Sequence, residues 1–354
     1  MLTVLALWLG TAVLACAPAT IAGTALASAA SPEGSSEGRL LVLNKHDNTL
    51  QVFDLPSNRL LATIAVGEEP HEVVVTPDGR KAYTANVRAD SLSVVDLRTY
   101  RVVRTIRSEN LKSPHGLGVT PDGRHLLVTS EGSRRIFLID AVRDVVLRSI
   151  TTTQNRAHML VILKGGRRAC VANVGSDSLT LLDLPGLRIV RNVKVGTGPE
   201  GIAAVPNGRW VLVALQGTDQ VAILDASSHD VLARLPTGQT PIRIAVTPNS
   251  FTALVTNRAS DDVTVIDVLG RRVRSTIRVG KRPGGLVTDA RGMRAYVANN
   301  ESNSVSIVSL AGFEVTGTIA TGAYPDGIAF VPAGAAGEGR TPSHGRPPKP
   351  GRRS

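Results

Sequence analysis

Three histidines and one glutamate recur at nearly equal intervals along the chain and are candidate ligands of a metal ion. His71, His115, His158 and Glu200 follow one another at intervals of 42 to 44 residues. Imidazole nitrogen and carboxylate oxygen are ligands that Zn²⁺ and other borderline divalent ions accept. The structural alternative is that each histidine only forms a hydrogen bond to the backbone of a neighbouring repeat. The metal interpretation requires a fold that brings these distant positions to one point.

The corresponding positions of the other repeats add groups that could orient an anionic ligand. They hold Ile242, Gly284 and Asp326, and Arg243 and Arg282 lie close by in the sequence. A guanidinium group can bind a carboxylate through two parallel hydrogen bonds, so these arginines are candidate ligand contacts together with Asp326. The alternative is that Arg282 forms an ion pair with Asp326.

The elements that must position these residues are visible in residues 70–107. Short apolar runs, namely HEVVV, KAYTAN, SLSVVD and RVVRTI, are separated by turn residues. Alternation over such short runs, rich in Val, Ile, Leu and Thr, is the pattern of half-buried strands. The turn at 76–79 has the sequence Thr-Pro-Asp-Gly, in which Pro presets φ and Gly supplies a positive one, so it predicts a tight hairpin. A repeat of four antiparallel strands is typical of one propeller blade.

Two series of residues predict seven blades. The residues that open the repeats are Pro70, Pro114, Ala157, Pro199, Pro241, Pro283 and Pro325. The residues that close the third strands are Asp54, Asp96, Asp140, Asp183, Asp225, Asp267 and Ser309. The first aspartate precedes the first proline, so one blade is divided between the chain termini, with outer strands at 39–43, 50–54 and 60–66 and an innermost strand at 326–331.

We therefore predict an all-β fold, a seven-bladed β-propeller of four-stranded antiparallel blades. The blade that is split between the N- and C-termini closes the ring and leaves no exposed sheet edge there. The residue after each opening residue begins an innermost strand. All seven such residues, the three histidines and Glu200 among them, are then expected around one mouth of the central channel.

Four tetrapeptides resemble a known repeat signature. Tyr83–Asn86, Cys170–Asn173, Leu254–Asn257 and Tyr296–Asn299 are similar to the sequence Tyr-Val-Thr-Asn. With the Thr-Pro-Asp-Gly turns, they make the chain from about residue 38 to 332 resemble the YVTN-type β-propeller repeat family. That family and its propeller relatives include binding proteins, lactonases, lyases and haem-binding domains. The resemblance therefore implies the fold and leaves the activity open.

The asparagines that end these tetrapeptides return to the same face as the histidines. Asn86, Asn173, Asn257 and Asn299 are therefore candidate ligand contacts. In the alternative interpretation each asparagine caps the tight turn that follows it, which is a frequent role of this residue.

The two ends of the chain are expected to lie outside the propeller of residues 39–332. Residues 1–30 carry no charged side chain and are rich in Leu, Val and Ala, which is typical of a secretory signal peptide. Two alternatives are a lipoprotein signal with an acylated Cys16 and an uncleaved membrane anchor. Residues 31–38 are expected to form a polar linker. Residues 333–354, rich in Gly, Pro and Arg, are expected to be a disordered basic tail that could associate with the cell envelope.

Composition and motifs together favour a binding protein of the cell exterior. The formal net charge is +11, but aromatic residues make up only 3% of the chain and offer few stacking platforms, so no nucleic-acid partner is expected. No nucleophile elbow, phosphate-binding loop or cysteine cluster occurs in the sequence. We expect an exported, non-enzymatic binding or interaction propeller with a small ligand or a protein at the channel mouth. Its assignment to bacteria rests on the family resemblance.

Two other functions remain open at this point. In a metal-dependent lyase or lactonase, His71, His115, His158 and Glu200 would hold a divalent ion as Lewis acid, while Arg243 and Arg282 would grip a carboxylate. In a haem-type cofactor protein, one of the histidines would be an axial ligand.

Overall fold

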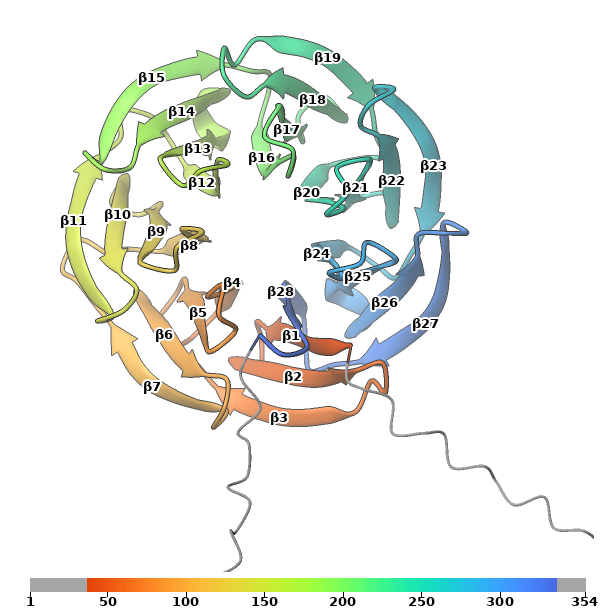
Figure 1. The fold of residues 1–354 in the computed structure, drawn as a ribbon, viewed down its shortest axis with the longest axis horizontal. Helices are drawn as coiled ribbons and strands as arrows, with labels where there is room; N and C mark the ends of the chain where they lie inside the picture. The colour runs from red at the N-terminus through yellow and green to blue at the C-terminus, as the bar shows by residue number, and fades with distance from the viewer. Residues whose placement is uncertain (1–36, 336–354) are drawn as a thin grey trace, which may run out of the picture. The chain divides into compact units, whose positions relative to one another are not determined.

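The computed structural model describes residues 37–335, which form a ring of seven four-stranded antiparallel sheets (Figure 1). The innermost strands are β28 (Pro325–Pro332), β4 (Pro70–Val75), β8 (Pro114–Val119), β12 (Ala157–Ile162), β16 (Pro199–Ala204), β20 (Pro241–Val246) and β24 (Pro283–Thr288). The second strands are β1 (Gly38–Asn44), β5 (Lys81–Asn86), β9 (His125–Ser130), β13 (Arg168–Asn173), β17 (Trp210–Leu215), β21 (Thr252–Asn257) and β25 (Arg294–Asn299). The third strands are β2 (Thr49–Leu55), β6 (Ser91–Asp96), β10 (Arg135–Asp140), β14 (Ser178–Asp183), β18 (Gln220–Asp225), β22 (Asp262–Asp267) and β26 (Ser304–Ser309). The outermost strands are β3 (Leu60–Ala65), β7 (Arg101–Ile106), β11 (Val145–Thr151), β15 (Arg188–Lys194), β19 (Val231–Pro236), β23 (Arg272–Arg278) and β27 (Glu314–Ala320).

We number these sheets as blades 1 to 7 in the order of the strands just given. The predicted all-β fold, the seven blades and their four-stranded antiparallel composition are confirmed. Blade 1 is built from both ends of the described chain, because β28 pairs antiparallel with β1. Figure 1 shows these two strands side by side although they lie at opposite ends of the colour bar. The four strands predicted for this blade agree with the structure to within one residue at each end.

Apolar side chains of adjacent blades form the core. Leu41 and Leu43 of blade 1 pack in one cluster with Val73 and Val95 of blade 2, and all four are buried. Complete burial of such a side chain contributes about 1.5–3 kcal/mol, so the stability of the ring is distributed over its blade interfaces. Cys170 belongs to the equivalent layer of blades 4 and 5, and burial raises the pKa of its thiol to about 12. It is buried in a strand, as expected of an inert thiol.

Each innermost strand begins directly after a residue with left-handed backbone. These residues, with φ between 46° and 63°, are Glu69, Ser113, Arg156, Gly198, Thr240, Arg282 and Tyr324. At six of the seven interfaces of the described ring, the N–H of this residue donates to an Asp or Asn side chain in a turn of the preceding blade. The bond from Ser113 N to Asp90 Oδ1, at 2.8 Å, is one example. These bonds fix where each inner strand starts and so position the residues that follow.

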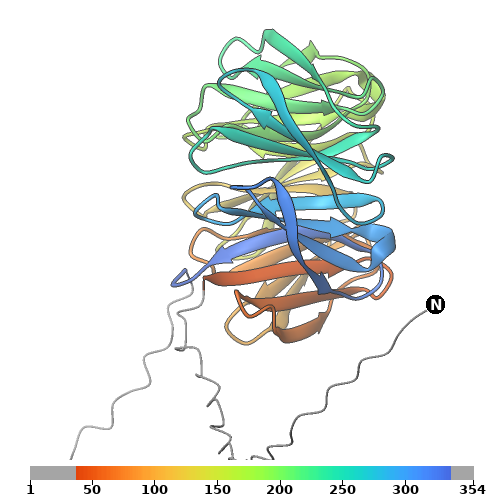
Figure 2. The same ribbon diagram turned by 90° about the vertical axis from the view of Figure 1, so that its right-hand side faces the viewer.

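The ring has two faces with different contents, and Figure 2 shows it from the side. The innermost strands begin and the second strands end on one face, which we call the mouth face. Because the strands of a blade alternate in direction, the turns at 76–79 and 97–100 and their equivalents lie on the opposite face, which we call the turn face. Residues that follow a strand opener are therefore separated from the Thr-Pro-Asp-Gly turns by the length of a strand.

The predicted signal at 1–30 lies outside the described residues, as do nearly all of the linker and of the tail. Within residues 37–335, β1 begins at Gly38 and β28 ends at Pro332. In this part of the chain no helix is long and apolar enough to cross a membrane.

Candidate functional site

The innermost strands bulge where they begin, and this brings the predicted site residues together. The pairing of β4 with β5 shifts by one residue between Pro70 and Glu72, and the pairing of β8 with β9 shifts between Pro114 and Leu117. An equivalent shift occurs in each of the other five blades. A β-bulge changes the direction of the side chains at its position, which is why such bulges are frequent beside functional sites.

Three histidines lie in a row from blade 2 to blade 4. The ring centroids of His71 and His115 are 4.0 Å apart, and those of His115 and His158 are 3.7 Å apart. His71 and His158 are separated by 6.5 Å, so His115 is in the middle. The structure therefore brings together the three histidines that the sequence places 43 and 44 residues apart.

His158, at one end of the row, is held by two carboxylates. Its Nδ1 bonds to Glu131, and its Nε2 lies 3.2 Å from Oε1 of Glu200. Burial opposes a charge on His158, but the bonds to Glu131 and Glu200 outweigh it and raise the pKa of the imidazole. Burial also disfavours an ionised Glu200, yet His158 and then Arg243 lower the pKa of this carboxyl to about 2. His158 and Glu200 thus form a charge-assisted pair in a buried setting.

His115 differs from His158 because neither of its ring nitrogens has a partner. The residue is 4% exposed, and both Nδ1 and Nε2 are buried without a hydrogen bond to any described residue. Burial, followed by the neighbouring His158 and His71, holds the pKa of His115 well below 6.5, so its ring is neutral at neutral pH. Nδ1 of His71 is also buried without a hydrogen bond. Because buried polar atoms are nearly always hydrogen-bonded, these three nitrogens point to a bound ion, ligand or water.

Arg243 reaches from blade 6 to the opposite side of the ring. Its Nε donates to Oε1 of Glu72 in blade 2 at 3.1 Å, and its NH1 lies 3.5 Å from Oε1 of Glu200. Burial disfavours the charges of both Arg243 and Glu72, but their mutual attraction raises the pKa of the guanidinium and lowers that of the carboxyl. Arg243 is therefore committed to two carboxylates of the protein itself.

Asp326 pairs with Lys45 and His71 rather than with Arg282. Its Oδ2 lies 3.6 Å from Nζ of Lys45 and 3.4 Å from Nδ1 of His71. Arg282 pairs with Glu301 at 3.1 Å, and its side chain is 43% exposed. The alternative of an Arg282–Asp326 ion pair is therefore wrong. The physical reason is that Arg282 is the left-handed residue directly before the strand opener, so it lies outside the bulge.

The four candidate asparagines are fully buried and bond to the third strand of their own blade. Nδ2 of Asn86 donates to the hydroxyls of Ser91 and Ser93 at 3.2 and 3.0 Å. Asn173, Asn257 and Asn299 make the corresponding pairs of bonds. All four are 0% exposed, so they hold the turn between the second and third strands and offer no surface to a ligand.

Two carboxylates of the site were not among the candidates from the sequence. Glu72 directly follows His71, and Glu131 directly follows β9. Glu131 takes the place after a second strand that Lys45 takes in blade 1. Second strands end on the mouth face, so the residue that follows each of them is also expected there. This position in the repeat could have identified Glu131 from the sequence.

Two groups of three side chains in this region could hold a metal ion. They are His71–Glu72–His115 and His115–Glu131–His158, and in each group the ligand atoms lie within 4.8 Å of one another. Both groups contain His115. Glu200, expected as a fourth ligand, is instead engaged by His158, by Arg243 and by the side-chain amide of Gln216 at 2.7 Å. The residues of these two groups, with Glu200, Arg243 and Asp326, are called the mouth cluster below.

The sequence and its repeats match one known family. The match to the YNCE-like beta-propeller family covers residues 2–143 and 165–294. The chain belongs to this family. The assignment agrees with the resemblance to YVTN-type propellers, and it includes most of the mouth cluster. His158 falls in the unmatched segment between the two matched parts.

Several solved structures share the fold of this YNCE-like propeller. Kuenenia stuttgartiensis hydrazine synthase has a TM-score of 0.71 at 21% identity, covering 81% of this chain and 99% of that chain. A functionally unknown protein from Desulfotomaculum acetoxidans DSM 771 has a TM-score of 0.74 at 15% identity, covering 83% and 99%. The dihydro-heme d1 dehydrogenase NirN in complex with DHE has a TM-score of 0.65 at 15% identity, covering 87% and 78%. At these identities the likeness is one of fold alone, and no curated protein matches the chain.

Proposed function

We propose that the protein is an exported, non-enzymatic binding propeller that takes its ligand at the mouth cluster through a divalent transition-metal ion. One observation carries this proposal: both ring nitrogens of His115 are buried without partners. Nδ1 of the neighbouring His71 also makes no hydrogen bond, although it lies 3.4 Å from the carboxylate of Asp326. Neutral imidazole is the form that binds Zn²⁺, Cu²⁺ and similar ions. The carboxylate of Glu72 lies within reach of both rings and would complete a site of three protein ligands. An ion with three protein ligands keeps a coordination position for an outside ligand.

The pairing of the arginines favours binding over catalysis. In a lyase or lactonase, Arg243 and Arg282 would be needed to grip a substrate carboxylate. Arg243 is instead held by Glu72 and Glu200, and Arg282 by Glu301. Opening a buried pair such as that of Arg243 leaves a buried charge without compensation, at a cost of about 3–5 kcal/mol, and substrate binding would have to supply this energy.

Metal titration of the full chain tests the proposal. The protein is purified without a His-tag, treated with chelator, dialysed and titrated calorimetrically with Zn²⁺ and Cu²⁺ at neutral pH. We expect one saturable site with a Kd well below millimolar. His115→Gln should weaken it at least tenfold, and His125→Gln, which alters a histidine on the turn face, should not. The site does not exist if no saturable binding occurs, or if the two variants bind alike while both remain folded by circular dichroism.

A haem-type cofactor is the second candidate for the same histidines. An axial ligand needs an imidazole nitrogen that is free of other bonds, and His115 supplies two such atoms. A solved structure of this fold is described as a dihydro-heme d1 dehydrogenase in complex with DHE. The absorbance spectrum of protein purified from its native host decides between the two: a Soret band supports haem, and its absence with stoichiometric metal supports the ion.

Export is supported by the uncharged, apolar residues 1–30. The mature protein is expected to begin near residues 29–31 or to carry lipid on Cys16. N-terminal sequencing of protein from the native host distinguishes these forms, and an intact Met1 on soluble cytosolic protein would refute export.

A further inference from the structure

A side-chain contact recurs between adjacent blades on the turn face, opposite to the mouth cluster. The first residue of the second strand of one blade, or in β1 the second residue, contacts the left-handed residue in the outer turn of the next blade. Three such pairs are Arg39–Tyr100, Lys81–Asp144 and Trp210–Arg271. The first is a hydrogen bond of 3.3 Å, the second an ion pair of 2.8 Å, and the third a cation–π contact of 5.8 Å. Each pair is chemically complementary.

Between blades 4 and 5 the same two positions hold Arg168 and His229, which are not complementary. His229 has φ 64° and is 1% exposed, and its Nε2 is buried without a hydrogen bond to any described residue. Its Nδ1 accepts a hydrogen bond of 3.4 Å from NH2 of Arg191. Burial, then Arg191 and Arg168, lower the pKa of His229. Where blade 3 supplies Asp144 to neutralise Lys81, blade 5 supplies no carboxylate for Arg168.

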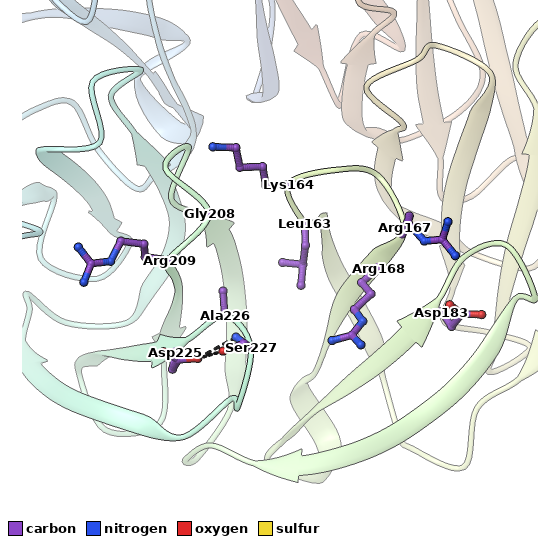
Figure 3. Close-up of a pocket in the computed structure, with 10 residues that line it drawn as sticks. All are labelled: Leu163, Lys164, Arg167, Arg168, Asp183, Gly208, Arg209, Asp225, Ala226 and Ser227. Atoms are coloured by element: carbon purple, nitrogen blue, oxygen red, sulfur yellow. Dashed lines mark hydrogen bonds between the residues drawn. The ribbon is translucent and has the colours of Figure 1, made fainter.

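This interface also contains a pocket of about 690 Å³, shown in Figure 3. Its cationic lining residues are Lys164, Arg167, Arg168 and Arg209, and its acidic ones are Asp183 and Asp225. Figure 3 shows Arg168 extending from β13 into the space between the two blades.

The two acids of the pocket are already engaged. Asp183 pairs with Arg188 at 3.3 Å, outside the lining. Asp225 accepts bonds from Ser227 and from the backbone of the turn, which hold the pKa of its carboxyl at about 2. Among residues 37–335, no carboxylate forms an ion pair with Arg167, Arg168 or Arg209, the three guanidinium groups of the lining.

We propose that the pocket between blades 4 and 5 is a binding site for a small multivalent anion, with Arg168 as its central contact. Guanidinium groups bind phosphate and carboxylate through paired hydrogen bonds, and the pocket volume is that of a small-molecule site. The anion supplies Arg168 with the negative charge that Lys81 receives from Asp144 between blades 2 and 3. Because this site is on the turn face, it is independent of the function proposed for the mouth cluster.

Calorimetric titration of the full chain with two probes, pyrophosphate and citrate, tests this site. The measurement uses chelator-treated, dialysed protein in about 50 mM salt, where electrostatic attraction is only partly screened. We expect at least one probe to bind with a Kd below 1 mM and Arg168→Gln to weaken it at least tenfold. Arg124→Gln should change the affinity less than twofold, because Arg124 follows the equivalent turn in blade 3 but lies outside this pocket. The stronger probe shows whether the site prefers phosphate or carboxylate groups.

A second variant keeps all four cations of the lining and adds a carboxylate at position 229, close to Arg168. His229→Asp recreates the pairing of Lys81 with Asp144, and Asp tolerates the left-handed backbone at this position. We expect this variant to stay folded and to lose probe binding although Arg168 is intact. The proposal fails if neither probe saturates below 1 mM. It fails equally if Arg124→Gln weakens binding as much as Arg168→Gln, since binding would then reflect the overall surface charge, or if folded His229→Asp binds like the wild type.

Discussion

Replacing Arg243 with methionine tests whether buried ion pairs hold the mouth cluster together. The arginine side chain is 8% exposed and pairs with Glu72 and Glu200, whose side chains are 13% and 11% exposed. Methionine keeps much of the volume but leaves both carboxylates without the guanidinium. Removing one partner of a buried pair costs about 3–5 kcal/mol, because the other charge remains buried. We expect the free energy of unfolding at pH 7 to fall by about this amount.

Arg282→Met is the matched control, since it removes the same charge from the same face of the ring. Arg282 and Glu301 also form an ion pair, but their side chains are 43% and 49% exposed. Exposed pairs contribute about 0–1 kcal/mol. The two variants should therefore differ by several kcal/mol although each loses one arginine.

The loss in Arg243→Met should also depend on pH in a definite direction. In the wild type the pKa values of Glu72 and Glu200 are lowered, the latter to about 2. The stability that these groups contribute is present above about pH 4.5, the usual pKa of Glu, and is lost as the pH falls through the folded values. Arg243 is the largest influence that lowers the pKa of Glu72, whereas Glu200 also has His158. Without Arg243 the pKa of Glu72 should rise most, so its protonation becomes easier and the stability deficit of the variant should shrink between pH 7 and pH 5.

Urea unfolding of metal-free protein, followed by circular dichroism at pH 7 and pH 5, measures both effects. The reasoning is refuted if Arg243→Met is no less stable than Arg282→Met at pH 7. It is also refuted if the deficit of Arg243→Met grows as the pH is lowered.

Three further predictions concern the ring itself. Removing residues from Pro325 onward should open blade 1, so that unfolding loses its cooperativity or the protein aggregates. Removing only 336–354 should leave the melting temperature nearly unchanged, and equal melting of the two truncations would contradict the split blade. Tyr83→Phe should cost about 1–3 kcal/mol in chemical denaturation, because the buried hydroxyl bonds to a carbonyl and a carboxylate of blade 3, and a neutral effect would show that these bonds do not stabilise the interface. Gly285→Ala should prevent folding or lower the melting temperature strongly, because its Cβ would lie 2.0 Å from a backbone oxygen of β28, whereas Gly317→Ala meets no atom closer than 3.5 Å and should be tolerated.

The fold could be predicted almost completely from the sequence because every blade repeats the same local signals. Six of the seven openers are proline, six of the seven third strands close with aspartate, and two blades have the Thr-Pro-Asp-Gly turn, all in the same register. A departure in one blade is therefore corrected by the others. The offset between the Pro70 series and the Asp54 series was sufficient to identify the split blade. Strand ends in blade 1 were correct to within one residue, because hairpin turns limit them on both sides.

The site was predictable as a set of positions and not as a set of contacts. The three residues His71, His115 and His158 occupy equivalent positions in the repeat. Their proximity could be predicted because it depends only on where the innermost strands start. It could not show that Arg243 crosses the ring to Glu72, because that contact joins positions 171 residues apart and depends on side-chain length. It also could not show that Glu131, outside the opener series, binds His158. Whether a side chain reaches across the central axis of the propeller depends on the dimensions of the whole ring. The repeat pattern in the sequence does not contain this information.

The divided first blade has a consequence for the order in which the protein can be completed. β1 finds its inner neighbour only when β28, nearly 300 residues later, has been made, since Leu40 lies opposite Phe330. Until then the growing chain presents an unpaired strand edge, which is a template for aggregation and exposes the chain to proteolysis. The last strand also places Asp326 beside His71, so the mouth cluster is complete only when the whole propeller is. A prematurely terminated chain therefore lacks both a closed ring and a complete mouth cluster. Proteolysis that starts at the exposed strand edge would remove such incomplete chains.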